Sequence, residues 1–194
     1  MIVFALIILI ACIWYIKYCS DVQIAIAHKG HTYYVNNNQS AEEKQRKVEL
    51  LHDLRSRTNM LIEELKNPKY ENEYSIQTLL RKAKARTIQF DELPNAPSLY
   101  RTFAFNVNKG ERISICLSSE NTINDLFFVI LHEVAHSMTE EYAHNERFWD
   151  NFKRLIEISI ETGLYENNNY SKDPKKFCNL VLNHNPYFDK YVLY

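Results

Sequence analysis

The chain has 194 residues, which is long enough for one domain with a sizeable hydrophobic core. Its apolar content of 46%, with 13% aromatic residues, excludes a largely disordered protein. A net charge of −1 gives no overall attraction to nucleic acid, so a nucleic-acid partner is not expected.

The amino terminus is strongly apolar. Residues 1–16 carry no charged side chain, and with the next three residues the run reaches the length of a membrane-spanning helix. We therefore expect an uncleaved transmembrane anchor at residues 1–19 and a tether at residues 20–39, with a cleaved signal peptide or a buried core helix as alternatives. Lysines flank only the C-terminal side of the run, which places the main domain on the cytosolic side of a host or virion membrane. The lipid bilayer is thus an expected partner.

Two helices are predicted after the tether. A capping box at residues 40–43 begins the first, and its apolar residues recur at helical spacing until Asn67-Pro68 ends it. Residues 75–85 form the second helix. Its basic run at residues 81–86 is interpreted as a solvated helix face, with nucleic-acid binding as the alternative.

Strand-like segments follow at residues 87–93, 101–107 and 111–117, and we expect them to form a small antiparallel sheet. Gly110 lies in the turn between the last two segments, where a positive φ is needed. Residues 32–35 also have the composition of a strand.

The C-terminal part predicts three more helices, at residues 123–138, 145–162 and 173–182. Asp173-Pro174 is a typical start for the last of these, and Gly163 is a typical end for the one before it. The order of helices, small sheet and helices indicates the α+β class.

Four cysteines, at positions 12, 19, 116 and 178, are scattered along the chain without a C-x-x-C pair. This spacing is not that of a zinc site. We expect free buried thiols rather than a disulfide framework.

The sequence HEVAH at residues 132–136 is the strongest chemical signal in the chain. On a helix, His132 and His136 lie one turn apart on the same face, so both imidazoles can bind one Zn²⁺ ion. Glu133 lies about 100° around the helix from His132, where it can contact a water on the ion. That water is the expected nucleophile and Glu133 its general base.

A catalytic zinc site needs a third protein ligand. His144 is the expected one, because the helix can end near Thr139 and the chain can then turn back toward the metal. Glu157 or Glu161 on the next helix, and the distant His184, are the alternatives. Tyr142 and Tyr165 are candidates for stabilising the oxyanion, by their location alone.

The segments NKGERISICL, FFVILHEVAH and HNERFWDNFKRLI together resemble the WLM domain, a relative of the SprT-like metallopeptidases. By this resemblance, His132, His136 and His144 fall on the family's zinc ligands and Glu133 on its general base. Phe148 and Trp149 fall on its aromatic pair. The resemblance implies a zincin-like fold for residues 40–194, with the core of the domain at residues 100–165.

These observations together predict a membrane-anchored zinc metallopeptidase that cleaves a protein or peptide substrate. A structural or scaffolding protein of a membrane or virion, with a zinc site that does not turn over, is the alternative. The DNA-repair role of the family's nuclear members is not expected here, because the chain has no strong basic patch. Scarce glycine and abundant Asn, Ile, Lys and Tyr fit an origin in a large DNA virus.

Overall fold

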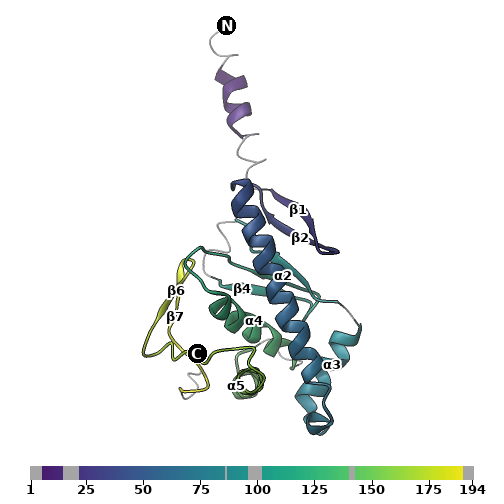
Figure 1. Cartoon of the computed structure of the whole chain (residues 1–194). Helices are drawn as coiled ribbons and strands as arrows, with labels where there is room; N and C mark the ends of the chain where they lie inside the picture. The colour runs from purple at the N-terminus through teal and green to yellow at the C-terminus, as the bar shows by residue number, and fades with distance from the viewer. Residues whose placement is uncertain (1–5, 15–21, 86, 96–101, 140–142, 190–194) are drawn as a thin grey trace.

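The computed structural model describes residues 6–14, 22–85, 87–95, 102–139 and 143–189. Within them the chain is α+β, as the sequence predicts. Small sheets lie beside a group of packed helices, and the longest helix runs along one side of the molecule (Figure 1).

The first described sheet is a hairpin of β1 (Gln23–His28) and β2 (His31–Asn36), where the sequence indicated a tether with one strand-like stretch. Lys29 and Gly30 form the turn, both with positive φ. This conformation matches the twist of the flanking strands and favours a two-residue connection. Tyr33 and Val35 of β2 are completely buried, so the hairpin packs onto the domain.

Helix α2 (Ala41–Glu64) confirms the first predicted helix. The Ser40 side chain caps it by accepting a hydrogen bond of 3.2 Å from the backbone N–H of Glu43. A short 3-10 helix, η1 (Pro68–Tyr70), leads to α3 (Tyr74–Ala85) beside the C-terminal end of α2 (Figure 1).

The main sheet contains β3 (Gln89–Glu92), β4 (Ala104–Val107) and β5 (Arg112–Ile115), in the order β3-β5-β4. Strand β4 is antiparallel to β5, and the turn between them is the predicted one. Strand β3 is parallel to β5, so the expectation of an antiparallel sheet is only half right. A long crossover that contains β4 brings the chain back beside β3 in the same direction, which a hairpin cannot do.

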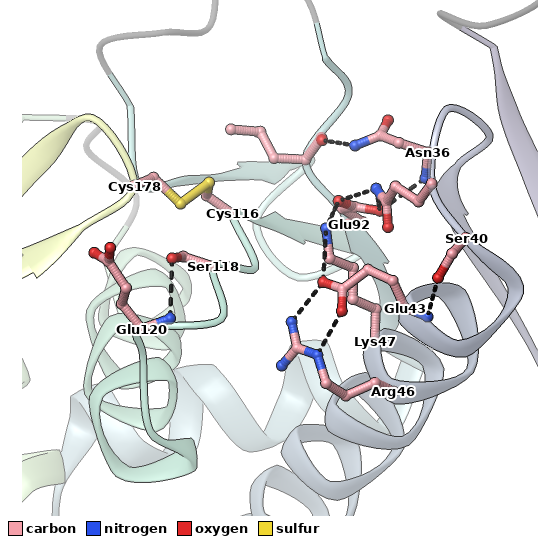
Figure 2. Close-up of polar contacts among 12 residues, drawn as sticks. Asn36, Ser40, Glu43, Arg46, Lys47, Glu92, Cys116, Ser118, Glu120 and Cys178 are labelled. Carbon is pink, nitrogen blue, oxygen red and sulfur yellow. Dashed lines mark hydrogen bonds and ion pairs between the residues drawn. A yellow bond between two sulfur atoms is a disulfide. The ribbon is translucent and has the colours of Figure 1, made fainter.

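Acidic side chains join the β1–β2 hairpin to the main sheet. Glu92 is buried, and its carboxylate accepts hydrogen bonds from the backbone N–H of Asn36 at 2.7 Å and from Lys47 Nζ at 2.6 Å (Figure 2). Asp91 accepts a bond of 3.1 Å from the backbone N–H of Tyr34 in the same way. These contacts hold β2 and α2 beside β3.

Helix α4 (Ile123–Ser137) is at the centre of the domain. It packs against β4 and β5 of the sheet and against helices α2, α3 and α5. A capping box between Thr122 and Asp125 begins it, as the sequence predicts. Helix α5 (Glu146–Glu161) follows and packs on α4.

The predicted last helix, at residues 173–182, is wrong. This segment is a second hairpin, β6 (Lys175–Phe177) and β7 (Leu180–Leu182). Cys178 in its turn has φ of 54°, which ends any helix, and burial of Phe177 and Leu182 fixes the hairpin in the core. The expectation of free thiols is also wrong for two cysteines, because a disulfide joins Cys116 to Cys178 (Figure 2).

The described residues also contradict the expected membrane anchor. Residues 6–14 are helical, and Cys12 within them is exposed with a free thiol. Nowhere in the described part of the chain is a helix both long enough and apolar enough to cross a bilayer. This finding corrects the expected transmembrane helix at residues 1–19 and the expected membrane localisation. The lipid partner stays an expectation, and positions 1–5 and 15–19, with Cys19, lie outside the described residues.

Candidate metal centre

Three histidines converge at the C-terminal half of α4. His132 and His136 extend from this helix, and His144 comes from the segment that precedes α5. His144 Nε2 lies 3.1 Å from His132 Nε2 and 3.1 Å from His136 Nε2. The structure thus brings together the three side chains that the sequence indicated as ligands.

The local sequence explains how His144 reaches the other two. Asn145 caps α5, with its side-chain oxygen accepting a hydrogen bond of 3.0 Å from the backbone N–H of Phe148. Since the cap fixes the start of α5, His144, which precedes Asn145, is held beside the first turn of this helix and faces α4. Phe148 is completely buried, and its ring centroid lies 4.4 to 4.9 Å from those of His132, His136 and His144.

The arrangement of these nitrogens fits a tetrahedral metal ion. Zinc–nitrogen bonds of about 2.0–2.1 Å at tetrahedral angles separate the ligand nitrogens by about 3.3 Å. At most one of the two contacts of His144 Nε2 can be a well-aligned two-centre hydrogen bond, because an imidazole nitrogen has either one proton or one lone pair. The three histidines could therefore hold one metal ion, with a fourth position left for water.

The electrostatics of the site favour neutral imidazole, which is the form that binds metals. Burial lowers the pKa of His132 well below its ordinary value. Burial, with the nearby His144 and Lys109, lowers the pKa of His136 to about 4. The pKa of His144 is lowered by burial as well.

Glu133 is buried, with 6% of its surface exposed, and it lines the same cavity as the three histidines. Burial raises the pKa of its carboxyl to about 7. A carboxyl group that titrates near neutral pH can both accept and return a proton, which a general base in hydrolysis must do.

A cavity of about 510 Å³ opens over the histidines. Its walls come from the β4 segment (102–106), from α4 and α5, and from residues 180–184 at the end of the second hairpin. This volume is in the usual range for a substrate-binding cavity.

The alternative metal ligands do not join the cluster. Glu157 forms an ion pair with Arg154, and Glu161 is exposed. His184 lines the cavity, where its ring centroid lies 5.3 Å from that of Trp149. It does not lie within ligand distance of the three clustered histidines.

The sequence indicated two tyrosines as candidates for stabilising the oxyanion. Tyr165 is buried against Phe128 and does not line the cavity. Tyr142 lies outside the described residues.

The basic run on α3 contributes to the site in a way that sequence reasoning missed. Lys82 Nζ donates hydrogen bonds to the backbone oxygens of Ser137 and Thr139, at 3.0 and 3.2 Å. Lys109 Nζ also donates to Thr139, at 3.0 Å. These cations stabilise the C-terminal end of the helix that presents the histidines.

Comparison with curated proteins finds relatives in two viruses. An uncharacterized protein, R325, of Acanthamoeba polyphaga mimivirus is 41% identical over 93 residues, which are 45% of this chain and 47% of that protein. An uncharacterized protein, 136R, of Invertebrate iridescent virus 6 is 33% identical over 70 residues, which are 32% of this chain and 39% of that protein. The aligned segments span less than half of each relative. Both sources support the expected origin in a large DNA virus.

No solved structure matches the chain. The model of the WLM domain matches residues 31–175, which include α2, the main sheet, α4 and α5. Because this match covers most of the chain, the protein belongs to the WLM-domain family.

Proposed function

We propose that this protein is a zinc-dependent metallopeptidase that cleaves a protein or peptide substrate. The observation that carries the proposal is the convergence of three imidazoles in a cavity that also contains a buried carboxyl group, with His144 Nε2 lying 3.1 Å from Nε2 of both His132 and His136. Membership of the WLM-domain family supports the same class of chemistry.

In this proposal His132, His136 and His144 hold the ion. A bound zinc ion lowers the pKa of a coordinated water and polarises the carbonyl group of the substrate. Glu133 accepts the proton of the attacking water and donates it to the leaving amine. Its pKa of about 7 suits both steps.

The position of β4 supports a peptide as the substrate. It is an edge strand in the described sheet, and residues 102–106 line the cavity consecutively. Alternate side chains of a strand point to opposite faces of the sheet. Because neighbouring residues of this segment all line the cavity, the backbone edge of the strand itself borders it. An extended peptide can add to such an edge through backbone hydrogen bonds.

The test measures both the metal content of the purified protein and its rate of peptide-bond cleavage. Purified wild-type protein is expected to hold one zinc ion per chain and to cleave a denatured protein, with loss of cleavage on chelation. Glu133→Gln should retain the zinc and lose at least about 100-fold in rate, because it cannot accept a proton. Glu161→Gln is the matched control, since this exposed residue of α5 is not a cavity residue and should not affect the rate.

Cleavage by Glu133→Gln at the wild-type rate would contradict the role of this residue. Zinc-loaded wild type that cleaves no protein or peptide would overturn the peptidase function and favour a scaffolding protein.

A further inference from the structure

The cavity has a largely apolar half, which adjoins the histidines, since the ring centroid of Phe152 lies 5.3 Å from that of His132. Its floor is formed by Phe128 and Val129 of α4 and by Phe152 of α5, all of which are buried. The segment that includes Phe103 and Phe105, beside and within β4, forms one wall. The buried side chains of the floor would exclude water from a group bound there and contribute hydrophobic free energy to its binding.

A second wall comes from the second hairpin. Leu180, Val181 and Leu182 of β7 line the cavity, and Val181 remains 51% exposed. The family match ends at residue 175, so this wall is built by residues beyond the matched range. Because Val181 lines the cavity and keeps half of its surface exposed, a ligand in the cavity can reach it.

Three contacts fix the hairpin in this position. The disulfide joins Cys178 in its turn to Cys116 at the end of β5 (Figure 2). The buried ring of Phe177 contacts that of Phe103, with centroids 5.4 Å apart. Asn121 Nδ2 donates a hydrogen bond of 2.8 Å to the backbone oxygen of Lys176. The wall is therefore held by the folded domain and is already in place before a ligand binds.

Charged side chains are few in this half of the cavity. Among the lining residues, Glu133 and Lys109 carry the acidic and basic groups. Lys109 Nζ donates to the backbone oxygen of Thr139, so part of its hydrogen-bonding capacity is satisfied by the helix end. An ionised substrate side chain placed against the phenylalanines would lose its hydration without gaining a charged partner.

We propose that this half of the cavity selects substrates with a large apolar or aromatic side chain directly beside the scissile bond, and that Val181 determines this preference. This inference rests on the proposed peptidase function, because only a peptidase has a scissile bond beside the bound side chain. A cavity of about 510 Å³ has room for a phenylalanine or tryptophan side chain together with the adjoining backbone.

The first experiment maps cleavage sites. A digest of a whole proteome is incubated with the zinc-loaded protein, and new termini are identified by mass spectrometry. Phe, Leu, Met and Trp are expected at one position beside the cleaved bond at least about 10-fold more often than Ala or Asp, which corresponds to about 1.4 kcal/mol. Cleavage without this preference would overturn the inference and leave the peptidase function intact.

The second experiment does not depend on turnover. The pentapeptides Gly-Gly-Phe-Gly-Gly, Gly-Gly-Ala-Gly-Gly and Gly-Gly-Asp-Gly-Gly, blocked at both ends, are titrated into Glu133→Gln by calorimetry. The Phe peptide should bind at least about 10-fold more tightly than the other two. Equal binding, or no measurable binding of the Phe peptide, would overturn the inference even if no peptide is ever cleaved.

Val181→Asp tests the hairpin wall in both experiments. It should reduce the preference for Phe over Ala to less than about 3-fold, without a change in zinc content or melting temperature, because half of this side chain is exposed. Val22→Asp is the matched control, since Val22 is 42% exposed and does not line the cavity. An unchanged preference in Val181→Asp would overturn the role of the hairpin.

Discussion

Asn106 Nδ2 donates a hydrogen bond of 2.7 Å to the backbone carbonyl oxygen of Glu133. Asn106 Oδ1 accepts a second bond, of 2.6 Å, from the backbone N–H of Gly110. One side chain therefore ties the edge strand and its turn to the helix that presents the histidines. Gly110 has a φ of 107°, which favours glycine, and a Cβ at this position would lie in a tight contact 3.3 Å from Ser137 Oγ.

This relationship predicts a positioning role for Asn106. Asn106→Ala should lower the free energy of unfolding by about 1–3 kcal/mol, because a partly buried N–H loses its partner. It should also lower kcat about 10-fold while zinc content stays at one per chain. Asn108→Ala is the control, because the bond from Asn108 to Glu111 in the same turn is exposed. Equal losses in the two variants would contradict the role of Asn106.

His144 and His184 both line the cavity, but only His144 lies with the other two histidines. His144→Ala should therefore weaken zinc binding at least about 100-fold, because the ion loses one of three protein ligands. His184→Ala should change the zinc affinity less than about 3-fold. Competition with a chelator of known affinity measures both. A comparable loss in His184→Ala would show that the ligand set includes this residue.

The lowered pKa values predict how the metal-free protein responds to acid. When the folded state binds protons less readily than the unfolded state, stability falls as pH decreases through the interval between the two pKa values. For His136 this interval runs from 6.5 down to about 4. The melting temperature of the metal-free protein should fall over that range, and the fall should be shallower in His136→Ala. An equal slope in both proteins would refute this assignment.

Long elements with strong end signals could be predicted from the sequence. Helix α4 has a capping box and an apolar periodicity, and it begins at Ile123 as expected. The approach of His144 to the other two histidines could be anticipated because the preceding helix was expected to end near Thr139, and α4 ends at Ser137. In each case the relevant forces act within one or two turns of helix.

Features that depend on tertiary contacts could not be predicted. The Cys116–Cys178 pair spans 62 positions, and no local pattern shows that their segments meet. Asp173-Pro174 is a typical helix start, but burial of Phe177 and Leu182 outweighs that preference and gives a hairpin. Asn106 has no sequence signal of its own, because its partners are brought to it by the packing of β4 on α4.

Removal of the disulfide is expected to affect stability and substrate binding together. Closure of a loop of 62 positions is worth about 4 kcal/mol in the chain-entropy model. The double variant of Cys116→Ser and Cys178→Ser should lose 2–4 kcal/mol of unfolding free energy, and its KM for an apolar peptide should rise about 5-fold because the hairpin wall is less restrained. Zinc content should not change. Cys12→Ser is the control, since that thiol is free and exposed. An unchanged KM would show that other contacts suffice to hold the hairpin.

The buried ion pair between Lys47 and Glu92 gives the largest expected effect away from the site. Their side chains are 9% and 5% exposed and lie 2.6 Å apart. Lys47→Met should cost about 3–5 kcal/mol, because it leaves the Glu92 carboxylate buried without its cation. Addition of Glu92→Gln to this variant should recover part of the loss, because the remaining group is neutral and can still accept the bond from Asn36. Lys66→Met, which removes an exposed pair with Glu63, should cost less than about 1 kcal/mol in the same urea titration. If both lysine variants lost the same free energy, burial would not be what makes the Lys47 pair important.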